Sequence, residues 1–88
     1  MKLIIAIVRD EDSEQVSSAL VNTGFRATRI ASTGGFLRRG STTLIVGVED
    51  EKVDEAIQVV REHCTPTVEP GMRRATLFVL KVERFTQV

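Results

Sequence analysis

In residues 2–24, KLIIAIVRDEDSEQVSSALVNTG, the apolar residues change from the pattern of a strand to the spacing of a helix, and this change decides the fold. The segment 2–8 is a short apolar run rich in β-branched side chains, which is typical of a buried strand. The acids and the serine at 10–13 supply negative charge and N-cap candidates for the start of a helix. Gly24 stands where a helix commonly ends in a left-handed residue. The helical spacing itself is given by Val16, Ala19, Leu20 and Thr23.

The rest of the chain contains two strands in succession, a second helix and a final strand. Residues 25–32 and 42–48 have the composition of strands, and the helix begins at Asp50. A proline-glycine pair precedes the last strand, residues 74–82. The order βαββαβ predicts an α+β, ferredoxin-like fold, in which a four-stranded antiparallel sheet carries both helices on one face. The expected apolar face of the second helix is Val53, Ala56, Ile57, Val60 and Cys64.

Two of the expected strands are apolar on both of their alternating faces. They are LIIAIV at residues 3–8 and ATLFVLKV at residues 75–82. Two helices cover only one face of such a sheet, and apolar patches of several hundred Å² are seldom left in contact with water. The sequence therefore predicts a homo-oligomer whose subunits pack their sheets together.

The chain of 88 residues has the length of a single small domain, residues 1–88. Its 12 basic and 12 acidic residues cancel, which argues against a general binder of nucleic acid or of membrane surfaces. The single cysteine, Cys64, has no partner for an intrachain disulfide and suits a reducing compartment. The apolar run near the amino terminus is too short for a signal peptide or a membrane span. We therefore expect a cytoplasmic protein with no membrane span.

The residue types needed for catalysis do not come together in the sequence. His63 and Cys64 are adjacent on a predicted helix, so their side chains point about 100° apart, and one histidine with one cysteine cannot complete a structural zinc site. Capping explains the acids at the helix starts. RNA-recognition modules share this strand order but stack bases on exposed aromatic residues, which LIIAIV and TTLIVGV lack. We expect no enzyme, no metal, no cofactor and no nucleic acid.

The loop expected between the second and third strands, STGGFLRRGST at residues 32–42, has an unusual composition. Its glycine pair can turn successive N–H groups toward an anion. Its phenylalanine and leucine could pack on a base, and its arginines, Arg38 and Arg39, suit phosphate. Residues 15–48 contain four arginines and no acid. A flexible, solvated turn explains the same residues without a ligand, so the loop alone leaves both interpretations open.

Six segments of the chain resemble the PII-like cyclic di-AMP receptor family, whose members are signal-transduction proteins related to nitrogen-regulatory PII. The segments are MKLIIAIVRDEDS, FRAT, ASTGGFLRRGSTT, GVED, ATLFV and VERFTQV. The resemblance covers nearly the whole chain except residues 65–73. It implies a PII-like homotrimer, in which three ferredoxin-like subunits pack their sheets around a central axis.

The resemblance also implies a dinucleotide site between neighbouring subunits, beneath the loop that joins the second and third strands. Gly24 and Ser41 each replace an asparagine of the family, and the first of these asparagines contacts adenine. The family's long second loop is shortened here to residues 65–73, and Arg73 and Arg74 replace a glycine pair. The positions that correspond to the ligand-binding residues are Arg26, Thr28, Gly35, Phe36, Leu37, Ser41, Gly47, Phe78 and Gln87.

Together these features predict a signal-transduction protein that binds a nucleotide second messenger at its subunit interfaces. Cyclic di-AMP is the first ligand expected, and another adenine nucleotide is the second. Binding would order residues 33–41, together with residues 65–73, and so regulate an unknown target protein. The alternative is a trimeric protein-interaction module that no longer binds nucleotide, in which Phe36 and Leu37 contact the partner.

Overall fold

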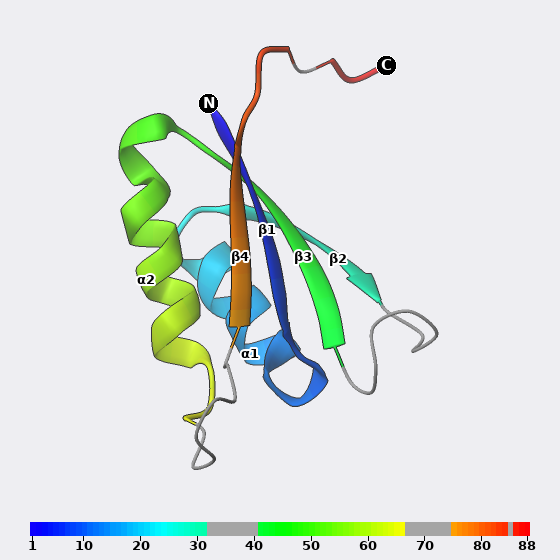
Figure 1. Cartoon of the computed structure of the whole chain (residues 1–88), viewed down its shortest axis with the longest axis vertical. Coiled ribbons are helices and arrows are strands. Elements are labelled where there is room, and N and C mark those ends of the chain that lie inside the picture. The colour runs from blue at the N-terminus through cyan, green and yellow to red at the C-terminus, as the bar shows by residue number, and fades with distance from the viewer. Residues whose placement is uncertain (32–40, 67–74, 85) are drawn as a thin grey trace.

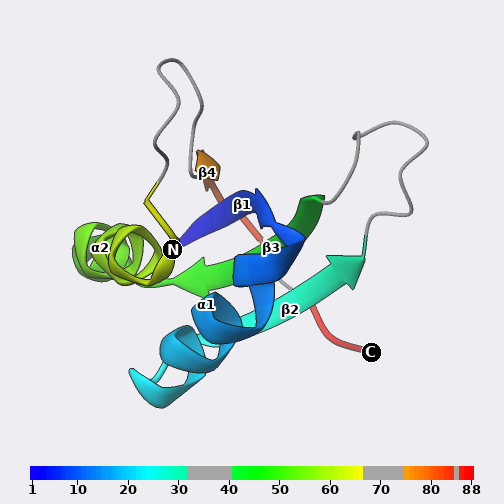
Figure 2. The same cartoon turned by 90° about the horizontal axis from the view of Figure 1, so that it is seen from below.

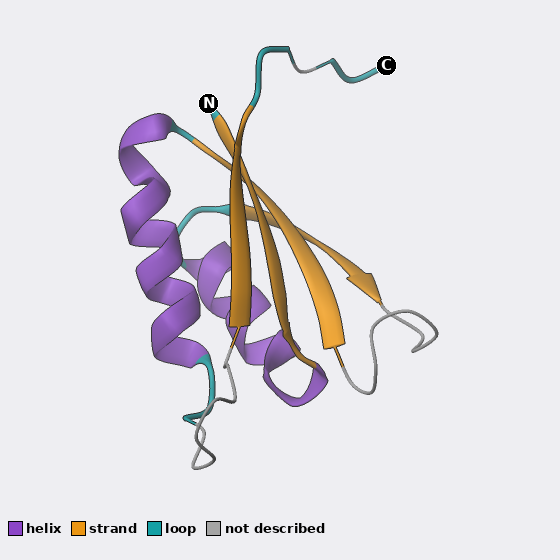
Figure 3. Ribbon diagram, in the orientation of Figure 1, coloured by secondary structure: helices purple, strands orange, loops and turns teal. Residues whose placement is uncertain are grey.

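The computed structural model describes residues 1–31, 41–66, 75–84 and 86–88 (Figure 1). The predicted order βαββαβ is confirmed, and neither of the two helices in these residues is long and apolar enough to cross a bilayer. A short 3₁₀ helix, η1, precedes the second α-helix. The elements, coloured by type in Figure 3, are β1 (Lys2–Arg9), α1 (Asp10–Asn22), β2 (Arg26–Ala31), β3 (Ser41–Val48), η1 (Asp50–Lys52), α2 (Val53–His63) and β4 (Ala75–Lys81).

The four strands form one antiparallel sheet in the order β2-β3-β1-β4. Strand β1 lies next to β4, and β3 separates it from β2, so the first and last segments of the chain meet inside one sheet. Figures 1 and 2 show both helices on the same side of the sheet. This is the ferredoxin-like arrangement expected from the sequence.

The hydrophobic core lies between the helices and one face of the sheet. Alternate residues of β1 and β3 are buried there, as the period of two in a strand requires. On α2 the most deeply buried side chains are those of Ala56 and Val60, followed by Val59, whereas Val53 and Ile57 are only partly covered. The predicted apolar face of this helix is therefore rotated toward Val59. The fully buried large side chains of the core are Ile4, Val8, Val16, Leu20, Leu44, Val46 and Val60.

Gly24 ends the first helix as expected. Its φ angle is +104°, a region that L-residues rarely adopt, and its N–H donates to Val21 O at 3.0 Å. The next N–H, of Phe25, donates to Leu20 O at 2.9 Å. These two bonds form a Schellman motif, which satisfies carbonyl groups at the end of α1 and turns the chain into β2.

The expectation that capping explains the acids at the start of α1 is wrong for Asp12. The residue at the N-cap position is Arg9, whose side chain makes no capping hydrogen bond. Asp12 is fully buried, and its carboxylate accepts hydrogen bonds from Thr65 N at 3.1 Å and Thr65 Oγ1 at 2.6 Å. It also pairs with the Arg9 guanidinium at 3.2 Å. Asp12 therefore joins the start of α1 to the residues that follow α2.

No described element covers the face of the sheet opposite the helices. The cross-strand register places alternate residues of all four strands on this face, which we call the open face. Its central part is apolar, and three large side chains near its edges are about half exposed: Ile30 at 48%, Phe78 at 51% and Leu80 at 46%. The two-sided apolar character read from the sequence is thus present in the structure.

Candidate functional site

A hollow of about 710 Å³ lies on the open face, at the end of the sheet where the chain begins. Four segments that are distant in the sequence meet there: the amino-terminal residues, β2, β3 and the residues after β4. Four of the residues singled out from the sequence share this hollow, namely Arg26, Thr28, Gly47 and Gln87. The other lining residues are Met1, Lys2, Leu3, Ile45, Val82 and Arg84.

Strand register brings the residues of β2 and β3 to the hollow. Arg26 is paired with Gly47, and Thr28 is paired with Ile45. Because cross-strand partners point to the same face of a sheet, all four lie on the open face. Their neighbours in the sequence, such as Ala27 and Val46, point toward the helices instead.

Gly47 keeps the floor of the hollow low. A Cβ atom at this position would lie 3.2 Å from Cε of Met1, which is tighter than most contacts of a real Cβ. The methionine is flexible, so the backbone does not require glycine here. The absence of a side chain instead leaves the space above β3 open to a ligand.

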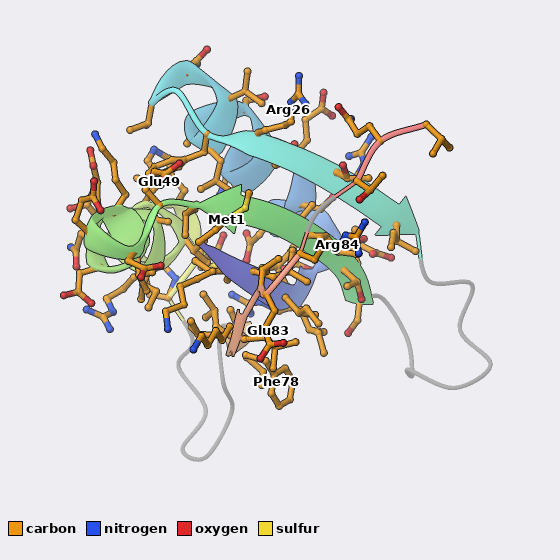
Figure 4. The ribbon with its side chains drawn as sticks, turned by 90° about the horizontal axis from the view of Figure 1, so that it is seen from above. Met1, Arg26, Glu49, Phe78, Glu83 and Arg84 are labelled. Carbon is orange, nitrogen blue, oxygen red and sulfur yellow. The ribbon has the colours of Figure 1, made fainter. Side chains whose placement is uncertain are left out.

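The residues after β4 form one wall of the hollow. Val82 N donates to Met1 O at 3.1 Å, which extends the pairing of β4 with β1 beyond the end of the strand. The chain then crosses the end of the sheet toward β2, as Figure 4 shows. This path carries Arg84 and Gln87 over the hollow that Arg26 also lines. Arg84 was not singled out from the sequence, where the sole signal is a cation three residues before Gln87.

The side chains that line the hollow are apolar, uncharged polar or positively charged. None of its lining residues is an acid, and neither Arg26 nor Arg84 forms an ion pair or a hydrogen bond with another described residue. Lys2 also borders the hollow, but strand alternation places its side chain on the helix side. The two guanidinium groups are therefore available to an anionic ligand.

The amino terminus is fixed beside the hollow by an ion pair. The α-amino group of Met1 lies 2.8 Å from Oδ1 of Asp50. The hydrogen bond from this amino group lowers the pKa of Asp50 and outweighs the opposing effect of desolvation, and the charges of the amino group, Lys2 and Lys81 act in the same direction. The pair holds Met1 where its side chain reaches Gly47.

A second hollow, of about 400 Å³, adjoins the first around the ends of β2 and β3. Met1, Arg26 and Gly47 line both hollows, so Arg26 stands at their junction. The second hollow is lined further by Thr23, Gly24, Phe25, Val48, Glu49 and Lys52. Two adjoining hollows with a guanidinium between them suit a ligand that has two bulky groups joined through phosphate.

The other residues expected at the site do not line the hollow. Phe78 is on the open face of β4, and Figure 4 shows it on the far side of Met1 and Arg84 from Arg26. Ser41 begins β3, six residues from Gly47 and thus about 20 Å away along the strand. Gly35, Phe36 and Leu37 lie outside the described residues, as do Arg38, Arg39, Arg73 and Arg74.

Comparison with known proteins identifies a family and a similar structure. Residues 1–69 match the family model described as cyclic-di-AMP receptor. The chain is also similar to a crystal structure described as that of a functionally unknown protein from Pediococcus pentosaceus ATCC 25745, with 34% sequence identity and a TM-score of 0.79. That similarity covers 99% of this chain and 96% of the other. The family match includes Arg26, Thr28 and Gly47, whereas Arg84 and Gln87 lie beyond its last residue.

Proposed function

This chain belongs to the cyclic-di-AMP receptor family, and we propose that it binds cyclic di-AMP in the hollow on the open face of its sheet. The family consists of receptors, in agreement with the expectation that the protein is not an enzyme. The observation that carries the proposal is the convergence of Arg26, Thr28, Gly47 and Gln87 on one hollow that contains no acid among its lining residues.

The chemistry of the hollow suits an adenine dinucleotide. Arg26 donates charge-assisted hydrogen bonds to a phosphate oxygen, and the planar guanidinium allows two parallel bonds. Thr28 offers a hydroxyl group on the same face. Leu3 and Ile45 give an apolar surface for a base, and Gly47 leaves room for it. Arg26 lies at the junction of the two hollows, where a phosphate between two nucleosides would lie.

The complete site lies between subunits of a homotrimer. Phe78 and Ser41 are on the open face but away from the hollow of their own subunit, and we assign them to the hollow of a neighbouring subunit whose open face packs against theirs. The same packing removes the half-exposed apolar side chains from water, which favours assembly. The loop expected from the sequence at residues 32–40 joins β2 to β3.

The ligand acts through that loop. Binding changes the conformation of the loop between β2 and β3 and so the surface that the trimer offers to a target protein. A ligand shifts such an equilibrium only by its different affinities for the two loop states. We assign this difference in affinity to contacts of the ligand with the backbone of Gly35 and with the side chains of Phe36 and Leu37.

Calorimetric titration of cyclic di-AMP into wild type and into Arg26→Ala tests the proposal. Loss of a charged hydrogen bond costs about 1.5–3 kcal/mol, so the dissociation constant should rise at least about tenfold. Arg29→Ala is the matched control, because Arg29 is paired with Leu44 and lies on the opposite face of the same strand. It should change the affinity less than about twofold, since an exposed charge outside the site is largely screened.

Equal affinities of wild type and Arg26→Ala would refute the role of Arg26. A thermal-shift panel of cyclic di-AMP, ATP, ADP and AMP identifies the preferred nucleotide, because ligand at a hundredfold excess over its dissociation constant stabilises the native state by about 2.7 kcal/mol. No response to any nucleotide would refute the proposal in favour of an interaction module without a nucleotide.

A further inference from the structure

We propose that Arg84 is a second phosphate-binding residue of the hollow and that it makes the site selective for ligands with two separated phosphate groups. Arg84 belongs to the C-terminal segment, residues 82–88, of which the structure describes all but residue 85. The inference rests on the proposed function, since it assigns the second anionic group of the ligand in the same site.

The path of the C-terminal segment places Arg84 opposite the edge strand that carries Arg26. Strand β4 is at one edge of the sheet and β2 at the other, with β1 and β3 between them. Adjacent strands are about 4.8 Å apart, so the two edges are separated by about 14 Å. Arg84 lines the same hollow as Arg26, which requires the C-terminal segment to turn back across the end of the sheet. Figure 4 shows this crossing.

The two arginines approach the hollow from different walls. Arg26 rises from β2, where its register with Gly47 fixes its direction. Arg84 comes from the C-terminal segment, which is fixed at its start by the hydrogen bond from Val82 N to Met1 O. Between the two lie the apolar side chains of Leu3 and Ile45 and the gap at Gly47. The hollow thus offers an apolar floor between two cations.

Neither guanidinium is engaged within the described part of the chain. Arg9, by comparison, is paired with Asp12, and Arg61 donates to Gln58 Oε1 at 3.2 Å. An arginine with no partner beside a hollow that lacks acids is well placed for a phosphate, for which its fork of donors is suited. Two such arginines match two phosphodiester groups, one negative charge each. A mononucleotide engages only one of them.

The experiment compares wild type, Arg84→Gln and Lys81→Gln, by titration with cyclic di-AMP, cyclic di-GMP and AMP. Lys81 carries the same charge three residues earlier but ends β4 and does not line the hollow. Arg84→Gln should weaken cyclic di-AMP binding about tenfold and AMP binding less than about threefold, because one phosphate remains with Arg26. Lys81→Gln should change either affinity less than about twofold at 150 mM salt. The ratio of the two affinities is a readout that a merely structural role of Arg84 would not alter.

The outcomes separate this inference from the proposed function. If Arg84→Gln binds cyclic di-AMP as tightly as wild type, while Arg26→Ala binds it weakly, Arg84 has no role and the proposed function stands. If the variant loses AMP and cyclic di-AMP affinity equally, the selectivity for two phosphates is overturned. If wild type binds cyclic di-GMP in an Arg84-dependent manner but not cyclic di-AMP, the proposed function fails and the two-phosphate site stands. Binding of neither cyclic dinucleotide overturns both.

Discussion

Replacing Phe78 by alanine tests whether another subunit covers the open face of the sheet. Phe78 is 51% exposed in the single chain. A phenylalanine side chain buries about 200 Å² when it is fully covered, so about 100 Å² remains for a neighbour. At about 25 cal/mol per Å² this area contributes about 2.5 kcal/mol per subunit. Over the three subunits of the proposed homotrimer the alanine variant should lose about 7.5 kcal/mol of assembly free energy.

A loss of that size has a large effect on assembly. The concentration at which half of the chains are assembled should rise on the order of several hundredfold, since this concentration varies as the square root of the dissociation constant of the trimer. Sedimentation velocity between about 1 and 100 μM measures this shift, and circular dichroism checks that the variant subunit is folded.

Val21→Ala is the matched control for this experiment. Val21 is 55% exposed but lies on α1, away from the open face. Its truncation should leave the sedimentation profile unchanged. A wild-type protein that is monomeric throughout this range would refute the reasoning, and so would a Phe78→Ala variant that assembles at the wild-type concentration.

Three further predictions concern stability, ligand access and pH. Asp12→Ala should lower the free energy of unfolding in urea by about 3 kcal/mol, because it removes the buried carboxylate that accepts hydrogen bonds from Thr65 and pairs with the Arg9 guanidinium. An effect below about 1 kcal/mol would contradict this. Gly47→Leu should weaken cyclic di-AMP binding at least about tenfold, because the leucine fills the hollow, and it should cost little stability. Gly24→Ala should instead lower the free energy of unfolding by about 1 kcal/mol, because the φ of +104° at this position strains a residue with a Cβ. The ion pair of Asp50, whose native pKa lies below 3.8, stabilises the native state above that pH and is lost as the pH falls through the native pKa. The difference in stability between wild type and Asp50→Asn should therefore shrink below pH 3.8, and a constant difference across that range would contradict the assignment.

The order of the elements could be predicted from the sequence because each is encoded locally. Apolar runs of strand length, helical spacing after acidic residues, and Gly24 at a helix end all act over a few neighbouring residues. The ends of the elements were less predictable, since they depend on tertiary contacts. Strand β3 includes Ser41, which pairs with Arg9 of β1, and a 3₁₀ helix, η1, precedes α2. The rotation of α2 toward Val59 likewise depends on what the helix packs against.

The site was also only partly predictable, because some of its residues come together through tertiary packing rather than through local sequence. That Arg26, Thr28 and Gly47 lie together was predictable, because they belong to regular strands in a family pattern and their register brings them to one hollow. The place of Arg84 at the hollow was not predicted, because the C-terminal segment has no periodicity and its path across the sheet is a tertiary property. Asp12 was misread, because a carboxylate at the start of a helix has the same sequence signature whether it caps that helix or reaches residues that follow another.

The separation of charge between the two layers has a kinetic consequence. Seven of the twelve acids lie in α1 and α2, on the helix side of the sheet, whereas Arg26 and Arg84 line the hollow on the opposite side. A dianion that diffuses toward the subunit is repelled from one side and attracted to the other, which steers it to the hollow and raises the rate of productive encounter. Since this steering acts over distances comparable with the Debye length, about 8 Å at physiological ionic strength, added salt should slow association much more than it speeds dissociation.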